Sequence, residues 1–198
     1  MHITGVIQAG GRSTRMGGEP KALLEIGGKR IVERVVDALA AVLPKLLVVT
    51  NTPEQYAFLQ LPMVPDRYPD GGALGGIASG LAAVDGDAAF TVACDMPFVH
   101  SNVVRLVLAH AGEADVVIPR VGEQYETMHA LYAKTCLAAM EARLRAGQLK
   151  IAAFFSDVRV FEIDANAVAR HRAPDLAFMN VNTPDELAKA RALAADID

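Results

Sequence analysis

Apolar and polar positions follow two patterns along this chain. Short apolar runs, which are typical of buried strands, are separated by longer stretches in which apolar residues recur every three or four positions, as on one face of a helix. The apolar runs predict strands over residues 3–8, 46–50, 63–65, 88–93, 115–119 and 158–163. The helical spacing predicts helices over residues 31–43, 77–84, 103–108 and 137–146. Strands that alternate with helices favour an α/β layered fold around a mostly parallel sheet.

Two further segments complete this organisation. Residues 131–133 are short and apolar, and we expect them to pair antiparallel at an edge of the sheet. Thr183-Pro184-Asp185-Glu186 has the form of a capping box, with proline at the first helical position, so a final helix should begin there. Because no repeat, linker or low-complexity tract interrupts the chain, we expect one domain over residues 1–198.

Several polar residues follow directly after predicted strands. Gln8 to Gly11, Asn51, Asp66 and Asp95 each lie at the carboxyl end of one. In open α/β sheets, ligands bind outside the carboxyl ends of the strands, near the point where the strand order reverses. Core packing does not explain polar groups gathered at this edge from distant sequence positions, so we expect them to form a ligand site.

The segment from Gln8 to Lys21 carries the strongest chemical signal. It holds four glycines, two arginines, one lysine and a single acidic residue. Glycines let backbone N–H groups approach oxygen atoms closely and the cations offset negative charge, so the segment suits a polyphosphate. It matches neither the dinucleotide pattern G-x-G-x-x-G nor the P-loop G-x-x-x-x-G-K-[ST]. An ordinary glycine-rich turn between strand and helix is the alternative.

Composition narrows the class of protein. Of the 198 residues, 52% are hydrophobic and 21% are charged, which is typical of a soluble globular domain with a substantial core. The formal net charge of −4 disfavours general nucleic-acid binding, whereas Arg12, Arg15 and Lys21 indicate a small anionic ligand. Cys94 and Cys136 lie far apart and the histidines are scattered, so neither a disulfide nor a zinc site is expected.

The sequence also indicates where the protein works. No apolar stretch approaches the ~20 residues that are needed to span a bilayer. The first residues run directly into a predicted strand and lack the charged and apolar regions of a signal peptide. We therefore expect a cytoplasmic protein.

A set of ordered motifs resembles a known family. The motifs are Ala9-Gly10-Gly11, Arg15-Met16-Gly17-Gly18 with Lys21, Asp66, Gly75-Gly76, Cys94-Asp95-Met96-Pro97 and Asn180-Val181-Asn182-Thr183-Pro184. In this order they cover nearly the whole chain and resemble the nucleotidyltransferases that make molybdenum cofactor dinucleotides, most of all the guanylyltransferase branch. Two positions depart from the family's pattern. Gln8 stands where an apolar residue usually lies beside the nucleotide base, and Met128 lies near a point where many members have proline.

The resemblance implies a fold and a reaction. The fold would be a three-layer, Rossmann-like (glycosyltransferase-A-like) nucleotidyltransferase with a mostly parallel mixed sheet. The reaction would transfer GMP from GTP to the terminal phosphate of molybdopterin, with Mg²⁺ as cofactor, releasing pyrophosphate and leaving the guanine dinucleotide cofactor. The partners would be GTP, molybdopterin (the molybdenum cofactor), and other cofactor-biosynthesis proteins or the chaperones of apo-molybdoenzymes, with no nucleic acid and no membrane.

Three residues form the predicted catalytic set. By resemblance, Asp95 is the metal ligand, and hard carboxylate oxygens suit Mg²⁺. Lys21 and Arg15 would neutralise charge on the α-phosphate and on the departing pyrophosphate. A turn-capping aspartate and a solvated lysine are the simpler explanations of Asp95 and Lys21. No protein nucleophile is needed, because the acceptor phosphate itself attacks the nucleotide.

The same resemblance predicts the residues that bind the nucleotide. They are Gln8, Ala9, Gly10, Gly11, Lys21, Asn51, Asp66, Gly75 and Asp95. Asp66 and Asn51 would bind the ribose or accept the donors on a guanine's Watson–Crick edge, although turn formation alone also explains Asn51. We interpret residues 71–76 as a glycine-rich loop before a helix, which either approaches the nucleotide or is a flexible surface loop.

Asn180 and Asn182 are the predicted acceptor-binding residues. They alternate around Val181, so both would project to one side of an extended segment. Capping of the last helix by Asn182 or Thr183 is the competing explanation, and the two roles are compatible.

Two other functions are compatible with the sequence. A molybdenum cofactor cytidylyltransferase, or another small-molecule nucleotidyltransferase that uses CTP or UTP, would share most of these motifs. Ala9-Gly10-Gly11 favours guanine, because cytidylyl relatives more often carry Ala-Ala-Gly there. A non-catalytic nucleotide-binding module would need the phosphate loop but not Asp95 with Lys21, and the chain carries both.

Overall fold

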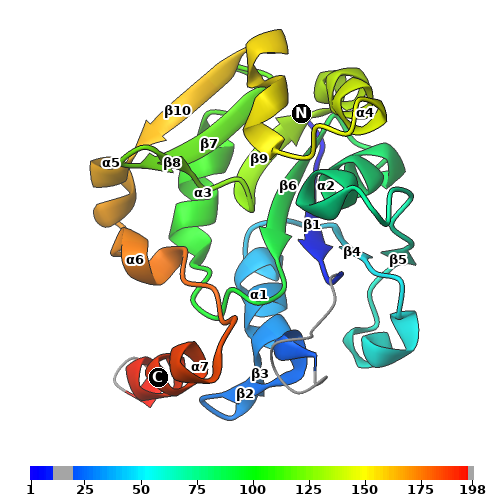
Figure 1. The fold of residues 1–198 in the computed structure, drawn as a ribbon. Helices are drawn as coiled ribbons and strands as arrows, with labels where there is room; N and C mark the ends of the chain where they lie inside the picture. The colour runs from blue at the N-terminus through cyan, green and yellow to red at the C-terminus, as the bar shows by residue number, and fades with distance from the viewer. Residues whose placement is uncertain (11–19, 196–198) are drawn as a thin grey trace.

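The computed structural model describes residues 1–10 and 20–195. These residues fold around an eight-stranded mixed sheet (Figure 1). Its strands are β1 (Ile3–Gln8), β4 (Leu46–Val49), β5 (Met63–Val64), β6 (Ala88–Ala93), β7 (Val116–Val121), β8 (Gln124–Tyr125), β9 (His129–Ala133) and β10 (Val160–Asp164). They lie in the order β10-β7-β9-β6-β1-β4-β5, with β8 paired to β7. Strands β4, β1 and β6 are parallel, as are β4 and β5 and also β7 and β10. The predicted α/β fold with a mostly parallel mixed sheet is confirmed.

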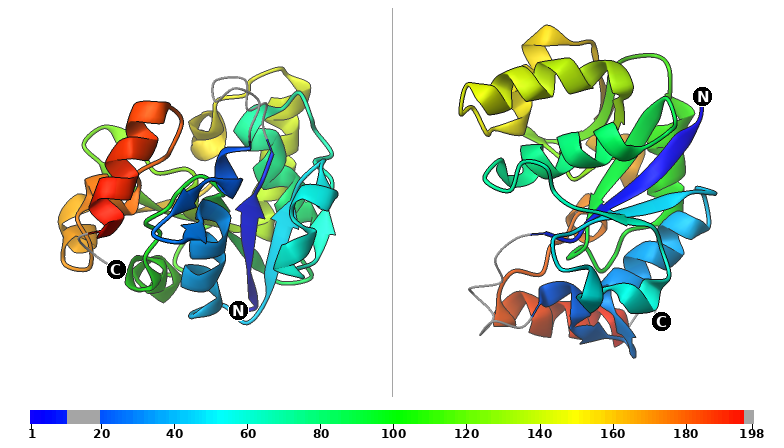
Figure 2. Two further views of the ribbon diagram at one scale, coloured as in Figure 1. Left: turned by 90° about the horizontal axis from the view of Figure 1, so that it is seen from below. Right: turned by 90° about the vertical axis from the view of Figure 1, so that its right-hand side faces the viewer.

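Helices cover both faces of the sheet, which makes three layers (Figure 2). On one face, α1 (Ile31–Ala40), α3 (Ser101–Ala109) and α5 (Ala165–Ala169) contribute to the core that contains Ile7 and Phe90. On the other face, α2 (Gly72–Ala83) and α4 (Leu137–Arg145) contribute to the core that contains Val6 and Tyr132. Neighbouring residues of one strand therefore enter opposite cores, as the alternation of side chains along a strand requires.

A smaller layer lies beyond the carboxyl ends of the central strands. It consists of the hairpin β2 (Glu25–Ile26) and β3 (Lys29–Arg30), the short helix α6 (Pro174–Ala177) and the final helix α7 (Pro184–Ala195). Figure 1 shows the hairpin and α7 together at the bottom of the view. A third apolar cluster joins these elements; its buried members are Ile26, Ile31, Phe98, Val181, Leu187, Ala190 and Ala194. The final helix begins at Pro184, as the capping box predicted.

Short 3₁₀ segments connect the larger elements. They are Lys21–Leu23, Pro53–Gln55, Ala57–Leu59, Lys134–Cys136 and Ile151–Asp157. The first of them holds Lys21 just before the β2–β3 hairpin. In the part of the chain that the structure describes, no helix is both long and apolar enough to cross a membrane.

The strand predicted at residues 131–133 is antiparallel, but it is not at an edge. Strand β9 lies between β6 and β7, where Leu131 pairs with both Phe90 and Val117. All five of its residues are buried. The prediction of an edge position was wrong because the sequence of a strand does not show which other strands pair with it. The buried, apolar β9 is explained by pairing on both sides.

Helix α2 begins at Gly72 rather than at residue 77, so the glycine-rich loop predicted over residues 71–76 is mostly helix. Glycine has low helix propensity, which favoured the interpretation as a loop. The packing of α2 explains the difference. A Cβ atom on Gly76 would lie 2.6 Å from Oε1 of Gln8, and one on Gly80 would lie 2.5 Å from Cγ1 of Val6. The glycines let the helix lie directly on β1, and this tertiary contact outweighs their propensity.

Candidate active site at the carboxyl edge of the sheet

The carboxyl ends of β1 and β6 lie side by side at the centre of the sheet. Gln8 pairs with Ala93, and the N–H of Cys94 donates to the carbonyl of Gln8 over 3.1 Å. Asp95 follows directly. The chain continues from β1 to β4 and β5 on one side and returns to β6 on the other, so the strand order reverses between β1 and β6. Ligands of open α/β sheets bind at such a point.

Asp95 is a half-buried carboxylate with a cation nearby. Burial raises the pKa of Asp95, because a charged carboxylate loses solvation inside the protein. The ammonium group of Lys21 opposes this effect and lowers that pKa, whereas the negative charge of Glu186 raises it. The fold thus brings together Asp95 and Lys21, the two described members of the predicted catalytic set. Arg15, the third member, lies outside the described residues.

Lys21 also contacts the predicted acceptor-binding segment. Its Nζ atom donates to Oδ1 of Asn182 over 2.8 Å, across 161 positions of sequence. The N–H of Val181 donates to the carbonyl of Asp95 over 2.9 Å. Because Val181 is fully buried in the third apolar cluster, the flanking Asn180 and Asn182 project away from that core. Residues 180–182 therefore lie directly beside Asp95.

The start of α7 holds Asn182 in place. A single oxygen of Glu186, Oε2, accepts the N–H groups of Asn182 and Thr183 over 2.6 and 2.9 Å. In return, the N–H of Glu186 donates to Oγ1 of Thr183 over 3.2 Å. This is the reciprocal arrangement of a capping box, so helix capping and positioning of Asn182 are achieved by the same residues.

Asn51 and Asp66 lie together at the ends of β4 and β5. Oδ1 of Asn51 accepts the N–H of Asp66 over 2.9 Å. Oδ1 of Asp66 accepts the N–H of Tyr68 and the hydroxyl of Ser79, each over 2.8 Å. The hydroxyl of Ser79 also accepts the N–H of Arg67 over 2.8 Å. Ser79 thereby fastens the loop that carries Asp66 to helix α2.

Gly75 is a buried helical residue rather than part of an open loop. A Cβ atom there would lie 2.5 Å from the backbone oxygen of Tyr68. Its role in the structure is to let α2 pack against the Asp66 loop. Ala9 is buried, and its N–H donates to the carbonyl of Val49 over 2.9 Å, whereas Gly10 is exposed. Gly11, which was also predicted to bind the nucleotide, lies outside the described residues.

Sequence reasoning missed three residues of this region. Ser79 gave no signal beyond a single hydroxyl in an apolar helix. Glu186 was noticed as a capping residue, but its bond to Asn182 was not foreseen. Tyr56 is buried next to Asp95: burial raises the pKa of its phenol, and the proximity of Cys94 and Asp95 raises it further. Only the tertiary structure places Ser79 beside Asp66, and Glu186 and Tyr56 near Asp95.

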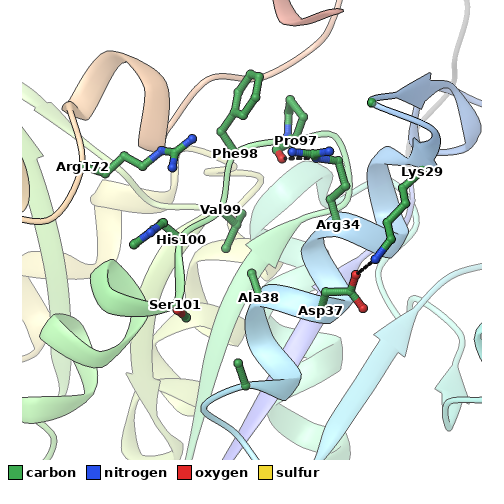
Figure 3. Close-up of a pocket in the computed structure, with 12 residues that line it drawn as sticks. Lys29, Arg34, Asp37, Ala38, Pro97, Phe98, Val99, His100, Ser101 and Arg172 are labelled. Atoms are coloured by element: carbon green, nitrogen blue, oxygen red, sulfur yellow. Dashed lines mark hydrogen bonds and ion pairs between the residues drawn. The ribbon is translucent and has the colours of Figure 1, made fainter. Parts of the chain in front are cut away.

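A pocket of about 540 Å³ lies beside this site, between α1 and residues 97–101 (Figure 3). None of the predicted site residues lines it. Figure 3 shows Arg34 reaching from α1 toward Pro97, and its Nε atom donates to the carbonyl of Pro97 over 3.1 Å. Lys29 forms an ion pair with Asp37 over 2.7 Å. The bond from Arg34 links α1 to the segment that follows Asp95.

The comparisons with known proteins agree with this geometry. Residues 5–160 match the model of the family described as MobA-like NTP transferase domain. The chain is 38% identical to the probable molybdenum cofactor guanylyltransferase of Pelotomaculum thermopropionicum, over 98% of this chain and 94% of the relative. It is 35% identical to the molybdenum cofactor guanylyltransferase of Desulfosudis oleivorans, over 96% and 95% of the two chains.

A solved structure has the same fold. The crystal structure of molybdopterin-guanine dinucleotide biosynthesis protein A from Archaeoglobus fulgidus superposes with a TM-score of 0.84, covering 98% of this chain and 100% of that chain at 22% identity. The fold, its carboxyl-edge site and these matches define a nucleotidyltransferase. More particularly, the chain belongs to the MobA-like NTP transferase family.

Proposed function

We propose that this protein is a molybdenum cofactor guanylyltransferase, which transfers GMP from GTP to the terminal phosphate of molybdopterin. An oxygen of that phosphate attacks the α-phosphorus of GTP. The bond from the α-phosphorus to the bridging oxygen of the β-phosphate breaks, and pyrophosphate leaves. The family and its relatives support the reaction class. The observation that carries the proposal is the convergence of Asp95, Lys21 and Asn182 at one point of the sheet edge.

The described residues fit a Mg²⁺ ion held by Asp95. Within residues 1–10 and 20–195, no group of three or more His, Cys, Asp or Glu side chains could hold a metal by itself. Mg²⁺ is commonly bound by one or two carboxylates together with substrate phosphates, so the single half-buried Asp95 is a suitable ligand. When bound, the ion would offset the negative charge of the phosphates.

The protein side chains would act mainly by position and charge. Lys21 would neutralise charge that develops on the α-phosphate and the pyrophosphate, with Arg15 in the same role. Asn182 accepts a hydrogen bond from Lys21 and would orient it, and with Asn180 it would face the acceptor. Asn51 and Asp66, held by Ser79, would bind the ribose and base. Holding both reactants in line accounts for much of the rate that such an enzyme needs.

Replacement of Asp95 tests the proposal. Asp95→Asn keeps the shape of the side chain but removes the charge, and we expect pyrophosphate release from GTP and molybdopterin to fall at least about 100-fold. Asp85→Asn is the matched control, because Asp85 is exposed and lies before β6, at the opposite end of that strand. Near-normal turnover of Asp95→Asn would contradict the role of this carboxylate.

A second measurement tests which nucleoside triphosphate the protein prefers. Calorimetric titration of GTP, CTP, UTP and ATP in the presence of Mg²⁺ should give the tightest binding for GTP. Tightest binding of CTP would instead identify a cytidylyltransferase. Binding of GTP without pyrophosphate release, given molybdopterin as acceptor, would identify a binding module.

A further inference from the structure

The side chain of Gln8 lies against helix α2 in an unusual way. Val6 and Gln8 point to the same face of the sheet, two positions apart on β1, and they meet Gly80 and Gly76, which are one helical turn apart on α2. A Cβ atom on Gly76 would lie 2.6 Å from Oε1 and 2.9 Å from Cδ of Gln8. The position of the carboxamide therefore depends on the absence of a side chain at residue 76.

The nitrogen atom of this carboxamide has no partner among residues 1–10 and 20–195. Nε2 of Gln8 is buried, and no described residue accepts a hydrogen bond from it. Most buried polar side-chain atoms in proteins have a hydrogen-bond partner, so each exception needs an explanation. At position 8 an apolar side chain would fill the same space without this penalty. An unpartnered N–H donor at the end of the central strand indicates a group that binds something other than the protein.

The residues around Gln8 indicate which kind of ligand its Nε2 atom would bind. Gln8 ends β1, which lies between β4 and β6, the strand that leads to Asp95. The strand that leads to Asp66, β5, lies on the far side of β4. Helix α2 presents Gly76 to Gln8 and, three positions later, Ser79 to Asp66. Among the described residues, one helix therefore supports a carboxamide whose Nε2 has no partner and a carboxylate bonded through Oδ1. The two groups lie at the ends of β1 and β5, which β4 separates.

We propose that Gln8 is a specificity-determining residue that reads the base of the nucleotide, its Nε2 donating to the carbonyl oxygen at position 6 of guanine. The inference rests on the proposed function. A donor from Gln8 and an acceptor from Asp66 match the adjacent C6 carbonyl and N1–H of a 6-oxopurine. A 6-aminopurine presents an amino donor in place of the carbonyl, which would oppose Nε2 donor to donor.

The inference can be tested by equilibrium binding without the acceptor. The three probes are GTP, ITP and 2-aminoadenosine triphosphate, titrated calorimetrically with Mg²⁺ present. ITP keeps the 6-oxo group and N1–H and lacks the 2-amino group. 2-Aminoadenosine triphosphate keeps the 2-amino group but carries a 6-amino group in place of the 6-oxo group and has no hydrogen on N1. We expect the wild type to bind GTP at least about tenfold more tightly than 2-aminoadenosine triphosphate, because the exchange removes the proposed partners of both Gln8 and Asp66.

Two substitutions of Gln8 should change this ratio in different ways. Gln8→Leu removes the donor, so GTP and ITP should lose affinity by the same factor, and the preference over 2-aminoadenosine triphosphate should fall to the part that Asp66 contributes through N1–H. Gln8→Glu replaces the donor with an acceptor that suits a 6-amino group, so the preference for GTP should fall further than in Gln8→Leu. Gln124→Leu is the matched control: Gln124 is exposed on β8, which β9 and β6 separate from β1, and the preference should be unchanged.

Gly76→Ala provides a test that leaves Gln8 in the chain. The added Cβ atom must displace the carboxamide, so the preference for GTP should fall as it does in Gln8→Leu. Thermal unfolding shows which variants are folded, and any folded variant suffices for the comparison. An unchanged preference in folded Gln8→Leu or Gly76→Ala would overturn the inference. These binding measurements test the role of Gln8 alone. Pyrophosphate release by the wild type tests the proposed function, so the two can fail independently.

Discussion

At the scale of single residues, His129 is the most unusual group outside the site. It is completely buried on β9, between the rings of Phe90 and Phe178, whose centroids lie 5.0 and 5.2 Å from its own. Neither ring nitrogen has a hydrogen-bond partner among the described residues. Burial lowers the pKa of His129 to about 3, because the apolar surroundings disfavour the charged form. The residue is therefore a neutral part of the core at pH 7.

We expect the stability of the protein to fall in mild acid because of His129. Since the folded-state pKa lies below the unfolded value of about 6.5, the unfolded chain takes up a proton first, and stability is lost as the pH falls from 6.5 toward 3. Between pH 7.5 and pH 5.0 the wild type should lose about 2 kcal/mol that His129→Phe does not lose. Urea unfolding at both pH values measures this difference. His171→Phe, at an exposed position, should behave as the wild type; equal losses in wild type and His129→Phe would contradict the prediction.

At the scale of elements, α2 shows how packing overrides propensity. The helix contains several glycines, yet all of its residues from Leu74 to Leu81 are buried. The contact of Gly80 with Val6 is the tightest of those on the apolar core. The helix exists because its small residues fit β1 closely, and its position in turn places Gly76 and Ser79 at the site.

Gly80→Ala should destabilise the protein although alanine is the better helix former. The new Cβ atom would lie 2.5 Å from Cγ1 of Val6 and 3.2 Å from Cγ2 of Val49. We expect a loss of about 1–3 kcal/mol from overpacking, more than the gain of about 1 kcal/mol in propensity. Urea unfolding measures the net effect. In a Val6→Ala background the same substitution should cost less, and an equal cost in both backgrounds would be inconsistent with a clash at Val6.

The capping box of α7 is a second element whose role extends beyond stability. Glu186 binds the backbone of Asn182, and Asn182 binds Lys21. Glu186 is thus a positioning residue that acts on Lys21 through another side chain.

Glu186→Ala should lower the free energy of unfolding by about 1 kcal/mol, the usual effect of losing a cap. It should also reduce kcat, because Lys21 loses its orientation. Glu186→Gln keeps an acceptor oxygen, so both its kcat and its free energy of unfolding should fall less than those of Glu186→Ala. Kinetics of pyrophosphate release and urea unfolding report the two effects. Asp185→Ala, in the same first turn but exposed, is the control; a similar loss of kcat in that variant would argue against positioning by Glu186.

At the scale of the whole molecule, the site lies between a large part with an extensive apolar core and a small part with a minor one. The central strands β1, β6 and β9 are covered by helices on both faces and paired on both edges. The hairpin β2–β3 and α7 form a small separate cluster on the other side of the site. Asp95 belongs to the first part, whereas Lys21 and Asn182 belong to segments attached to the second.

Hydrogen exchange should report this division. Peptides from β1, β6 and β9 should exchange most slowly, near the rate of global unfolding, whereas those from β2–β3 and α7 should exchange faster through local opening. Mass spectrometry of exchanged peptides measures this order. Saturating GTP with Mg²⁺ should slow exchange mainly in the second part. Equal protection of α7 and β6 in the free protein would show that the molecule opens only as a whole.

Much of the fold could be predicted because its signals are local. The strands β1, β4, β5 and β6 and the helices α1, α3, α4 and α7 lie close to their predicted bounds, since burial on one or two faces leaves a periodic pattern in the sequence. The position of β9 and the start of α2 could not be predicted in this way. Both depend on neighbours that are distant in sequence, namely β7 for β9 and β1 for α2.

The sequence by itself determined the class of the fold, the polar residues at strand ends and the motifs that mark the family. These follow from periodicity and local residue chemistry, which each segment carries independently. Only the tertiary structure decided that Lys21 bonds Asn182, that Ser79 holds Asp66 and that Nε2 of Gln8 is buried with no partner among the described residues. The physical reason is that hydrogen bonds and burial depend on distances in space, which arise only when the chain has packed.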